Sequence, residues 1–78
     1  MNLEEALDYA AENLPDFWTI YIGVEQGSGW VKLESPDHEE FYMHEDSDMD
    51  LTEQVLAAVK TAHAEELANN IKNNENIL

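Results

Sequence analysis

The chain has 78 residues, of which 18 are acidic and three are basic, and its formal net charge at pH 7 is −15. A chain of this length folds as one domain around one modest core. Because Lys32, Lys60 and Lys72 are its only cations at neutral pH, we expect no direct binding to nucleic acid or to an anionic membrane. The absence of cysteine excludes disulfide bonds and thiolate metal sites.

The charge imbalance calls for an explanation, because like charges on a small globule repel one another and destabilise the compact state. A net charge of magnitude about 2 to 8 is enough to keep a small domain soluble. The excess therefore predicts a surface that binds a positively charged partner. No stretch approaches the roughly 20 apolar residues that span a bilayer, and residues 1–5 lack the layout of a signal peptide, so a cytoplasmic location is expected.

The first predicted element is a helix that begins after Asn2, which with Glu5 three positions later forms a variant of the capping box. An apolar stripe at three- and four-residue spacing follows, made of Leu3, Ala6, Leu7, Ala10 and Leu14. Pro15 ends this helix, because the residue before a proline is disfavoured in the α region.

Three strands are predicted next, over residues 17–25, 30–34 and 39–44, separated by turns at 26–29 and 35–37. One face of the sheet is expected to carry Trp18, Ile20, Ile22, Val24, Val31, Leu33, Phe41 and Met43. The opposite face is expected to carry the aromatic residues Phe17, Tyr21, Trp30 and Tyr42. The short connections favour an antiparallel meander.

The last predicted element is a helix capped by Asp48 or Asp50, with Glu53 completing a second capping box. Its buried stripe is Leu51, Val55, Ala58, Val59, Ala62 and Leu67. The asparagines after position 68 weaken it, so residues 71–78 are expected to be frayed or disordered. The prediction is therefore one α+β domain over residues 1–70, in the order α-β-β-β-α, with both helices on one face of a three-stranded antiparallel sheet.

Two features of this scaffold are candidate partner-binding surfaces. The first is an acidic run made of Asp37, Glu39, Glu40, Glu45, Asp46, Asp48, Asp50 and Glu53, which the carboxylates of the first helix are expected to extend. A solvated loop followed by a favourable helix N-terminus also accounts for the local run. The second is the outer aromatic face with Tyr21, Trp30 and Tyr42, a composition typical of interface hot spots but also of cross-strand packing.

Catalytic and metal chemistry find little support in the sequence. The Asp46-x-Asp48-x-Asp50 run opens like a calcium-binding loop, but Leu51 replaces the required glycine and Ala57 the bidentate glutamate. His38, His44 and His63 share no ligand spacing, and no phosphate loop or nucleophile elbow is present. We therefore expect a protein that is not an enzyme and uses no metal or cofactor.

The remaining prediction is binding by charge mimicry, in which carboxylates occupy the phosphate positions of a basic groove and aromatic side chains add an apolar anchor. In architecture and charge, over about residues 2–68, the chain resembles the small acidic anti-CRISPR inhibitors and other DNA mimics of phages. The resemblance implies inhibition of a CRISPR effector. Other nucleic-acid-binding proteins remain open as targets. The alternative is a non-inhibitory interaction module that dimerises through the aromatic face.

Overall fold

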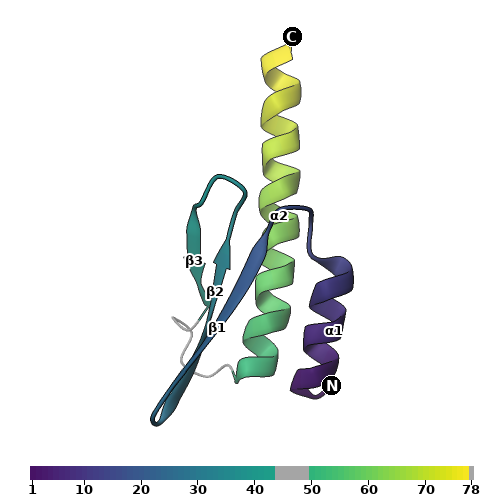
Figure 1. Ribbon diagram of the computed structural model, residues 1–78. Helices are drawn as coiled ribbons and strands as arrows, with labels where there is room; N and C mark the ends of the chain where they lie inside the picture. The colour runs from purple at the N-terminus through teal and green to yellow at the C-terminus, as the bar shows by residue number, and fades with distance from the viewer. Residues whose placement is uncertain (44–49, 78) are drawn as a thin grey trace.

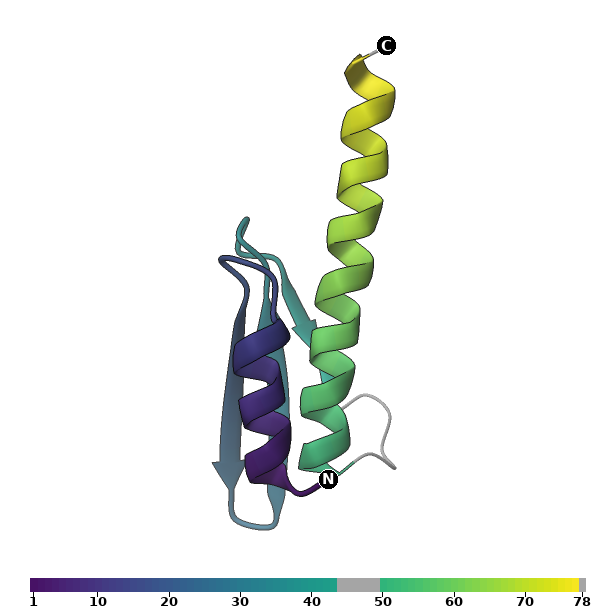
Figure 2. The ribbon, with the colours of Figure 1, turned by 90° about the vertical axis from the view of Figure 1, so that its right-hand side faces the viewer.

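The computed structural model describes residues 1–43 and 50–77, with side chains through Asn70 (Figure 1). The elements, in chain order, are α1 (Leu3–Asn13), β1 (Thr19–Glu25), β2 (Ser28–Glu34), β3 (Glu40–Tyr42) and α2 (Leu51–Ile77). The three strands form one antiparallel sheet in the order β1-β2-β3. Both helices lie side by side on the same face of this sheet (Figure 2). The α+β fold predicted from the sequence is confirmed.

The limits of α1 follow from its two ends. The Asn2 side-chain oxygen accepts a hydrogen bond from the Glu5 amide at 2.8 Å, and the Glu5 carboxylate accepts one from the Asn2 amide at 3.1 Å. This reciprocal capping box satisfies two amides that have no partner inside the helix. At the other end Leu14 has the extended conformation that Pro15 favours in the residue before it.

Short connections fix the register of the sheet. Glu25 pairs with Ser28, so that only Gln26 and Gly27 join β1 to β2, and Gly27 has a φ of 85°. Glycine adopts this left-handed conformation without a steric cost. The connection from β2 to β3 is longer, over residues 35–39, and is closed by a hydrogen bond from the Ser35 amide to the Glu39 carbonyl at 2.9 Å.

The core lies between the sheet and the two helices and consists of Ala6, Ala10, Trp18, Val31, Leu33, Val55, Ala58, Val59 and Ala62. The small alanine side chains let the helices approach each other and the sheet closely. Two polar contacts reinforce this packing. Trp18 Nε1 donates to Glu66 Oε1 at 2.7 Å, which joins the start of β1 to α2, and the His63 ring lies 2.6 Å from the Asn13 carbonyl oxygen, which joins α1 to α2.

Four boundaries differ from the predicted ones. Phe17 does not belong to β1; it lies in a turn closed by a hydrogen bond from the Trp18 amide to the Pro15 carbonyl, and its φ is 71°. β2 begins at Ser28 rather than at position 30, because the turn before it is shorter than expected. β3 contains only three residues and ends at Tyr42.

The fourth difference concerns α2, which continues as a helix to Ile77 instead of ending near residue 70. Its last turns extend beyond the sheet and α1 (Figures 1 and 2), so the molecule measures 51 × 22 × 20 Å. Leu67 was predicted to be buried, but it is 62% exposed. Glu66, one residue earlier, contacts Trp18, and at 3.6 residues per turn the Leu67 side chain points about 100° away from that direction.

Candidate partner-binding surface

The face of the sheet opposite the helices brings together three of the four predicted aromatic residues. Tyr21 pairs with Lys32 across β1 and β2, and Lys32 pairs with Tyr42 across β2 and β3, so these three residues form one row. Trp30 lies in the neighbouring row opposite Gly23. We call this set of Tyr21, Trp30, Lys32 and Tyr42 the outer aromatic face.

Close packing fixes the position of the Trp30 ring. A Cβ atom added to Gly23 would lie 2.0 Å from the indole, so the ring covers the glycine and leaves no space for a larger residue. Tyr21 and Tyr42 remain 43% and 44% exposed, respectively. The fourth predicted residue, Phe17, does not join them because it lies in the turn before β1.

Lys32 lies at the centre of the outer aromatic face, a position that was not predicted from the sequence. Its ammonium group is 4.7 Å from the centroid of the Tyr21 ring and 3.7 Å from the Glu40 carboxylate. The ammonium position over the ring is that of a cation–π interaction. The alternation of β2 contained the signal, since Lys32 is two residues from Trp30 and must share its face.

Glu40 also binds Tyr42, whose hydroxyl donates to Glu40 Oε2 at 2.8 Å. This hydrogen bond, together with the negative charge of Glu40, raises the pKa of Tyr42 above its ordinary value, while nearby Lys32 opposes the shift. Glu40 was predicted to bind a cation of the partner. In the structure its carboxylate already has two internal contacts, and a partner would have to compete for it.

The predicted acidic residues are only partly brought together. Glu39 and Glu53 are exposed, and the Asp50 side chain accepts a hydrogen bond from the Glu53 amide at 2.8 Å, so Asp50 caps α2 as predicted. Glu45, Asp46 and Asp48 lie outside the described residues.

The carboxylates of α1 do not join the outer aromatic face. Glu4, Asp8 and Glu12, which we call the acidic row, follow one another at four-residue spacing and are exposed. Because α1 covers the other face of the sheet, the acidic row lies on the opposite side of the molecule from the outer aromatic face (Figure 2). The acidic row is therefore separate from the outer aromatic face.

Most of the described negative charge has no internal counter-charge. Among the side chains that the structure describes, Glu40 is the only carboxylate paired with a lysine, and Glu34 is the only one paired with a histidine, His38 Nδ1 at 3.5 Å. The acidic row belongs to the unpaired majority. Within the same described part, no group of three or more acidic or histidine side chains is arranged to hold a metal ion.

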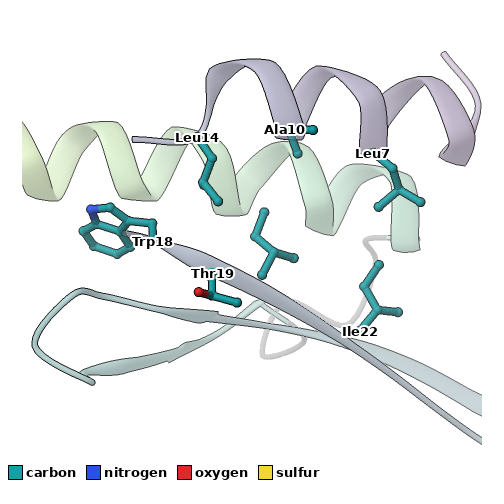
Figure 3. Close-up of a pocket in the computed structure, with 8 residues that line it drawn as sticks. Leu7, Ala10, Leu14, Trp18, Thr19 and Ile22 are labelled. Carbon is teal, nitrogen blue, oxygen red and sulfur yellow. The ribbon is translucent and has the colours of Figure 1, made fainter. Parts of the chain in front are cut away.

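Hollows open among the described residues on the helix side of the sheet. One, of about 270 Å³, lies between α1 and β1 and is lined by apolar side chains that include Leu7, Leu14 and Ile22 (Figure 3). Another, of about 470 Å³, lies between the helices beside Tyr9 and His63.

In the described part of the chain no helix is both long and apolar enough to cross a membrane. Comparisons of the chain with protein-family models, curated proteins and solved structures find no match.

Proposed function

We propose that this chain is an inhibitor that binds the basic nucleic-acid-binding groove of a partner protein by mimicking the charge of DNA or RNA. The observation that carries the proposal is the unpaired negative charge: a net charge of −15 with a single described carboxylate–lysine pair. Such a surface repels itself in the free protein and gains most when lysines and arginines of a partner neutralise it. The class of target proposed first is a CRISPR effector in the cytoplasm of a bacterium that carries a phage.

The outer aromatic face supplies the second part of the binding surface. Long-range attraction speeds association, but exposed charge pairs contribute little to the lifetime of a complex. Trp30, held in place over Gly23, and the half-exposed rings of Tyr21 and Tyr42 offer rigid apolar area beside Glu40. Buried aromatic residues at the centre of an interface are the usual source of lasting affinity.

The proposal is tested by displacement of nucleic acid. Purified CRISPR effectors, each bound to fluorescently labelled target DNA, are titrated with the chain, and release of DNA is followed by fluorescence anisotropy. We expect release that weakens steeply between about 50 and 200 mM NaCl, because salt screens exposed charges. Failure to release DNA from effectors and from a panel of basic nucleases would reject mimicry.

A matched pair of variants tests the contribution of the outer aromatic face. Trp30→Ala removes the central ring, and we expect a loss of about tenfold or more in inhibition, as for a hot-spot residue. Leu67→Ala removes a comparably apolar side chain that is 62% exposed on α2, away from the outer aromatic face, and should leave inhibition unchanged. Circular dichroism establishes that both variants fold.

The second candidate is a dimerising interaction module, which the exposure of Tyr21 and Tyr42 favours. Analytical ultracentrifugation distinguishes it from mimicry. A dimer held by the outer aromatic face would persist in high salt and dissociate in the Trp30→Ala variant. A monomer that binds a basic partner in a salt-dependent way would exclude it.

A further inference from the structure

The backbone of β1 is open along its outer edge. Val31, which lies opposite Ile22, donates its amide hydrogen to Gln54 Oε1 at 3.2 Å and so does not donate it to β1. In an antiparallel ladder, pairs that exchange hydrogen bonds alternate with pairs that do not. The Ile22–Val31 pair is therefore of the second kind, and the amide and carbonyl of Ile22 point away from β2. Ile20 and Val24, two residues to either side of Ile22, therefore also point their amides and carbonyls away from β2.

This edge lacks the features that usually protect a strand from pairing with another chain. Natural edge strands are typically short, or carry proline, lysine or an inward-pointing charge. β1 has seven residues, contains no proline, and its one charged residue is Glu25 at its end. The opposite edge, β3, is only three residues long and begins with Glu40.

The side chains next to the open edge form an apolar surface. Ile20 and Ile22 of β1 and Leu7 of α1 line the 270 Å³ hollow, and the Leu7 and Ile22 side chains point toward one another in Figure 3. Val24 continues this surface along the strand and is 75% exposed. An added strand at this edge would find backbone partners on β1 and an apolar groove beneath α1.

The rim of the hollow is acidic. Glu4 precedes Leu7 by three residues and Asp8 precedes Ala11 by three, and residues three apart are neighbours on a helix surface. The two carboxylates, four residues apart, are separated by about 6 Å along the helix axis. Alternate side chains of an extended chain repeat every 6.6 to 6.8 Å or so, which matches this spacing.

We propose that the open edge of β1 and the hollow beside it bind an extended segment of the partner that carries lysine or arginine at alternate positions, added to the sheet as a fourth strand. The aliphatic stems of these side chains cover Leu7 and Ile22, and their charges reach Glu4 and Asp8. A second copy of the chain is a poor occupant. Pairing of two β1 edges would place two acidic rows side by side in a complex of twice the net charge.

This inference takes the cationic nature of the partner from the proposed function, but its test needs no natural partner. The probe is an acetylated and amidated octapeptide of four Arg-Thr repeats, added at low salt to the ¹⁵N-labelled full chain. We expect slower amide hydrogen exchange at Ile20, Ile22 and Val24, and little change at Tyr21 and Gly23, whose amides already face β2. This alternation is the signature of an added strand.

Two control peptides carry the same charge. One has four arginines followed by four threonines; the other is the alternating peptide with N-methyl groups along one backbone edge. Both should bind at least tenfold more weakly. Equal binding of all three peptides would show simple charge attraction and overturn the proposal.

Paired variants test the acidic rim. Glu4→Gln with Asp8→Asn should weaken the alternating peptide about tenfold, whereas Glu39→Gln with Glu53→Gln makes the same change of charge away from β1 and should have little effect. Equal losses would overturn the proposal.

Self-association would overturn it as well. In that case the amides of Ile20, Ile22 and Val24 would become protected from hydrogen exchange without peptide as the protein concentration rises, because the occupant would be a second copy. Loss of the peptide site leaves DNA displacement by the outer aromatic face intact, so the two proposals fail separately.

Discussion

Phe17 has a backbone conformation that a bulky residue rarely adopts. It occupies the third position of the turn from Pro15 to Trp18 with a φ of 71°, where glycine is preferred, and its ring is 85% exposed. The next residue, Trp18, is buried and hydrogen-bonded to Glu66, so the turn cannot relax without moving a core side chain. The left-handed conformation costs a non-glycine residue roughly 1–2 kcal/mol.

Replacement of Phe17 by glycine should therefore stabilise the fold. We expect a gain of up to about 1 kcal/mol, because relief of the left-handed conformation exceeds the extra chain entropy of glycine in the unfolded state. Urea denaturation followed by circular dichroism measures the change. His38→Gly tests the same effect at the other described non-glycine residue with a positive φ, at 67°. A loss of stability in Phe17→Gly would show that the ring makes a contact that outweighs the strain.

The Glu40–Tyr42 contact makes a prediction about alkaline pH. The hydrogen bond and the charge of Glu40 stabilise the neutral phenol, which raises the pKa of Tyr42 above 10.0 in the folded state. The resulting stabilisation is full below the pKa of the unfolded state and is lost as the pH rises through the folded-state pKa.

Substitution of Glu40 by glutamine should lower the pKa of Tyr42 toward its ordinary value, because the neighbouring negative charge is removed. The titration is followed through the NMR signals of the Tyr42 ring. Glu39→Gln removes a charge one residue away that makes no contact with the phenol, and should shift the pKa much less. Equal shifts in the two variants would attribute the effect to overall charge rather than to the contact.

Between elements, the pairing of Gly23 with Trp30 decides the shape of the outer aromatic face. The indole occupies the space that a Cβ atom at position 23 would need, so Gly23→Ala should push the ring off the sheet. We expect a loss of about 1–3 kcal/mol in the free energy of unfolding, the usual cost of overpacking. A change in tryptophan fluorescence should accompany it.

A double-mutant cycle isolates this contact. With Trp30→Ala in the background, the added methyl group at position 23 meets no ring, and the cost of Gly23→Ala should largely disappear. The same cost in both backgrounds would mean that glycine is required by the backbone of β1 and not by the indole.

The elements show where sequence reasoning succeeds and where it stops. Asn2, Glu5 and Pro15 determine α1 by local chemistry, and the prediction of that helix was correct. The predicted start of β1 was wrong, because Phe17 continues the alternating pattern into a turn and only its backbone conformation reveals the difference. Leu67 was predicted to be buried from its spacing alone. Its exposure follows from the helical period, because the stripe through Val59 and Ala62 continues to Glu66, which contacts Trp18, and not to Leu67.

The candidate site was predictable to a similar extent. Alternation placed Tyr21, Trp30 and Tyr42 on one face, and the register of the strands confirms this arrangement. The position of Lys32 between two tyrosines required that register, as did the open edge of β1. The separation of the acidic row from the outer aromatic face depends on which face of the sheet α1 covers, a tertiary property.

At the scale of the whole molecule, the unpaired charge opposes folding. The described side chains contain one carboxylate–lysine pair, and the remaining carboxylates repel one another across a domain with a small core of alanine, valine, leucine and tryptophan. At pH 7, far above the isoelectric point of about 4.1, this repulsion is fully developed. A protein that needs to be stable only in its complex with a cationic partner tolerates such a loss of stability in the free state.

Sodium chloride should therefore stabilise the free protein at pH 7. We expect the free energy of unfolding to rise by on the order of 1 kcal/mol between about 10 and 500 mM, as the Debye length falls below the separation of neighbouring carboxylates. Urea is the suitable denaturant because it is uncharged, whereas guanidinium chloride would itself screen the charges.

The variant that combines Glu4→Gln, Asp8→Asn and Glu12→Gln neutralises the acidic row, so it should be more stable at low salt and respond less to added salt. If stability is independent of salt and the triple variant gains nothing, repulsion in the folded state is negligible. The charge would then have no cost for a cationic partner to relieve, and the thermodynamic argument for mimicry would be lost.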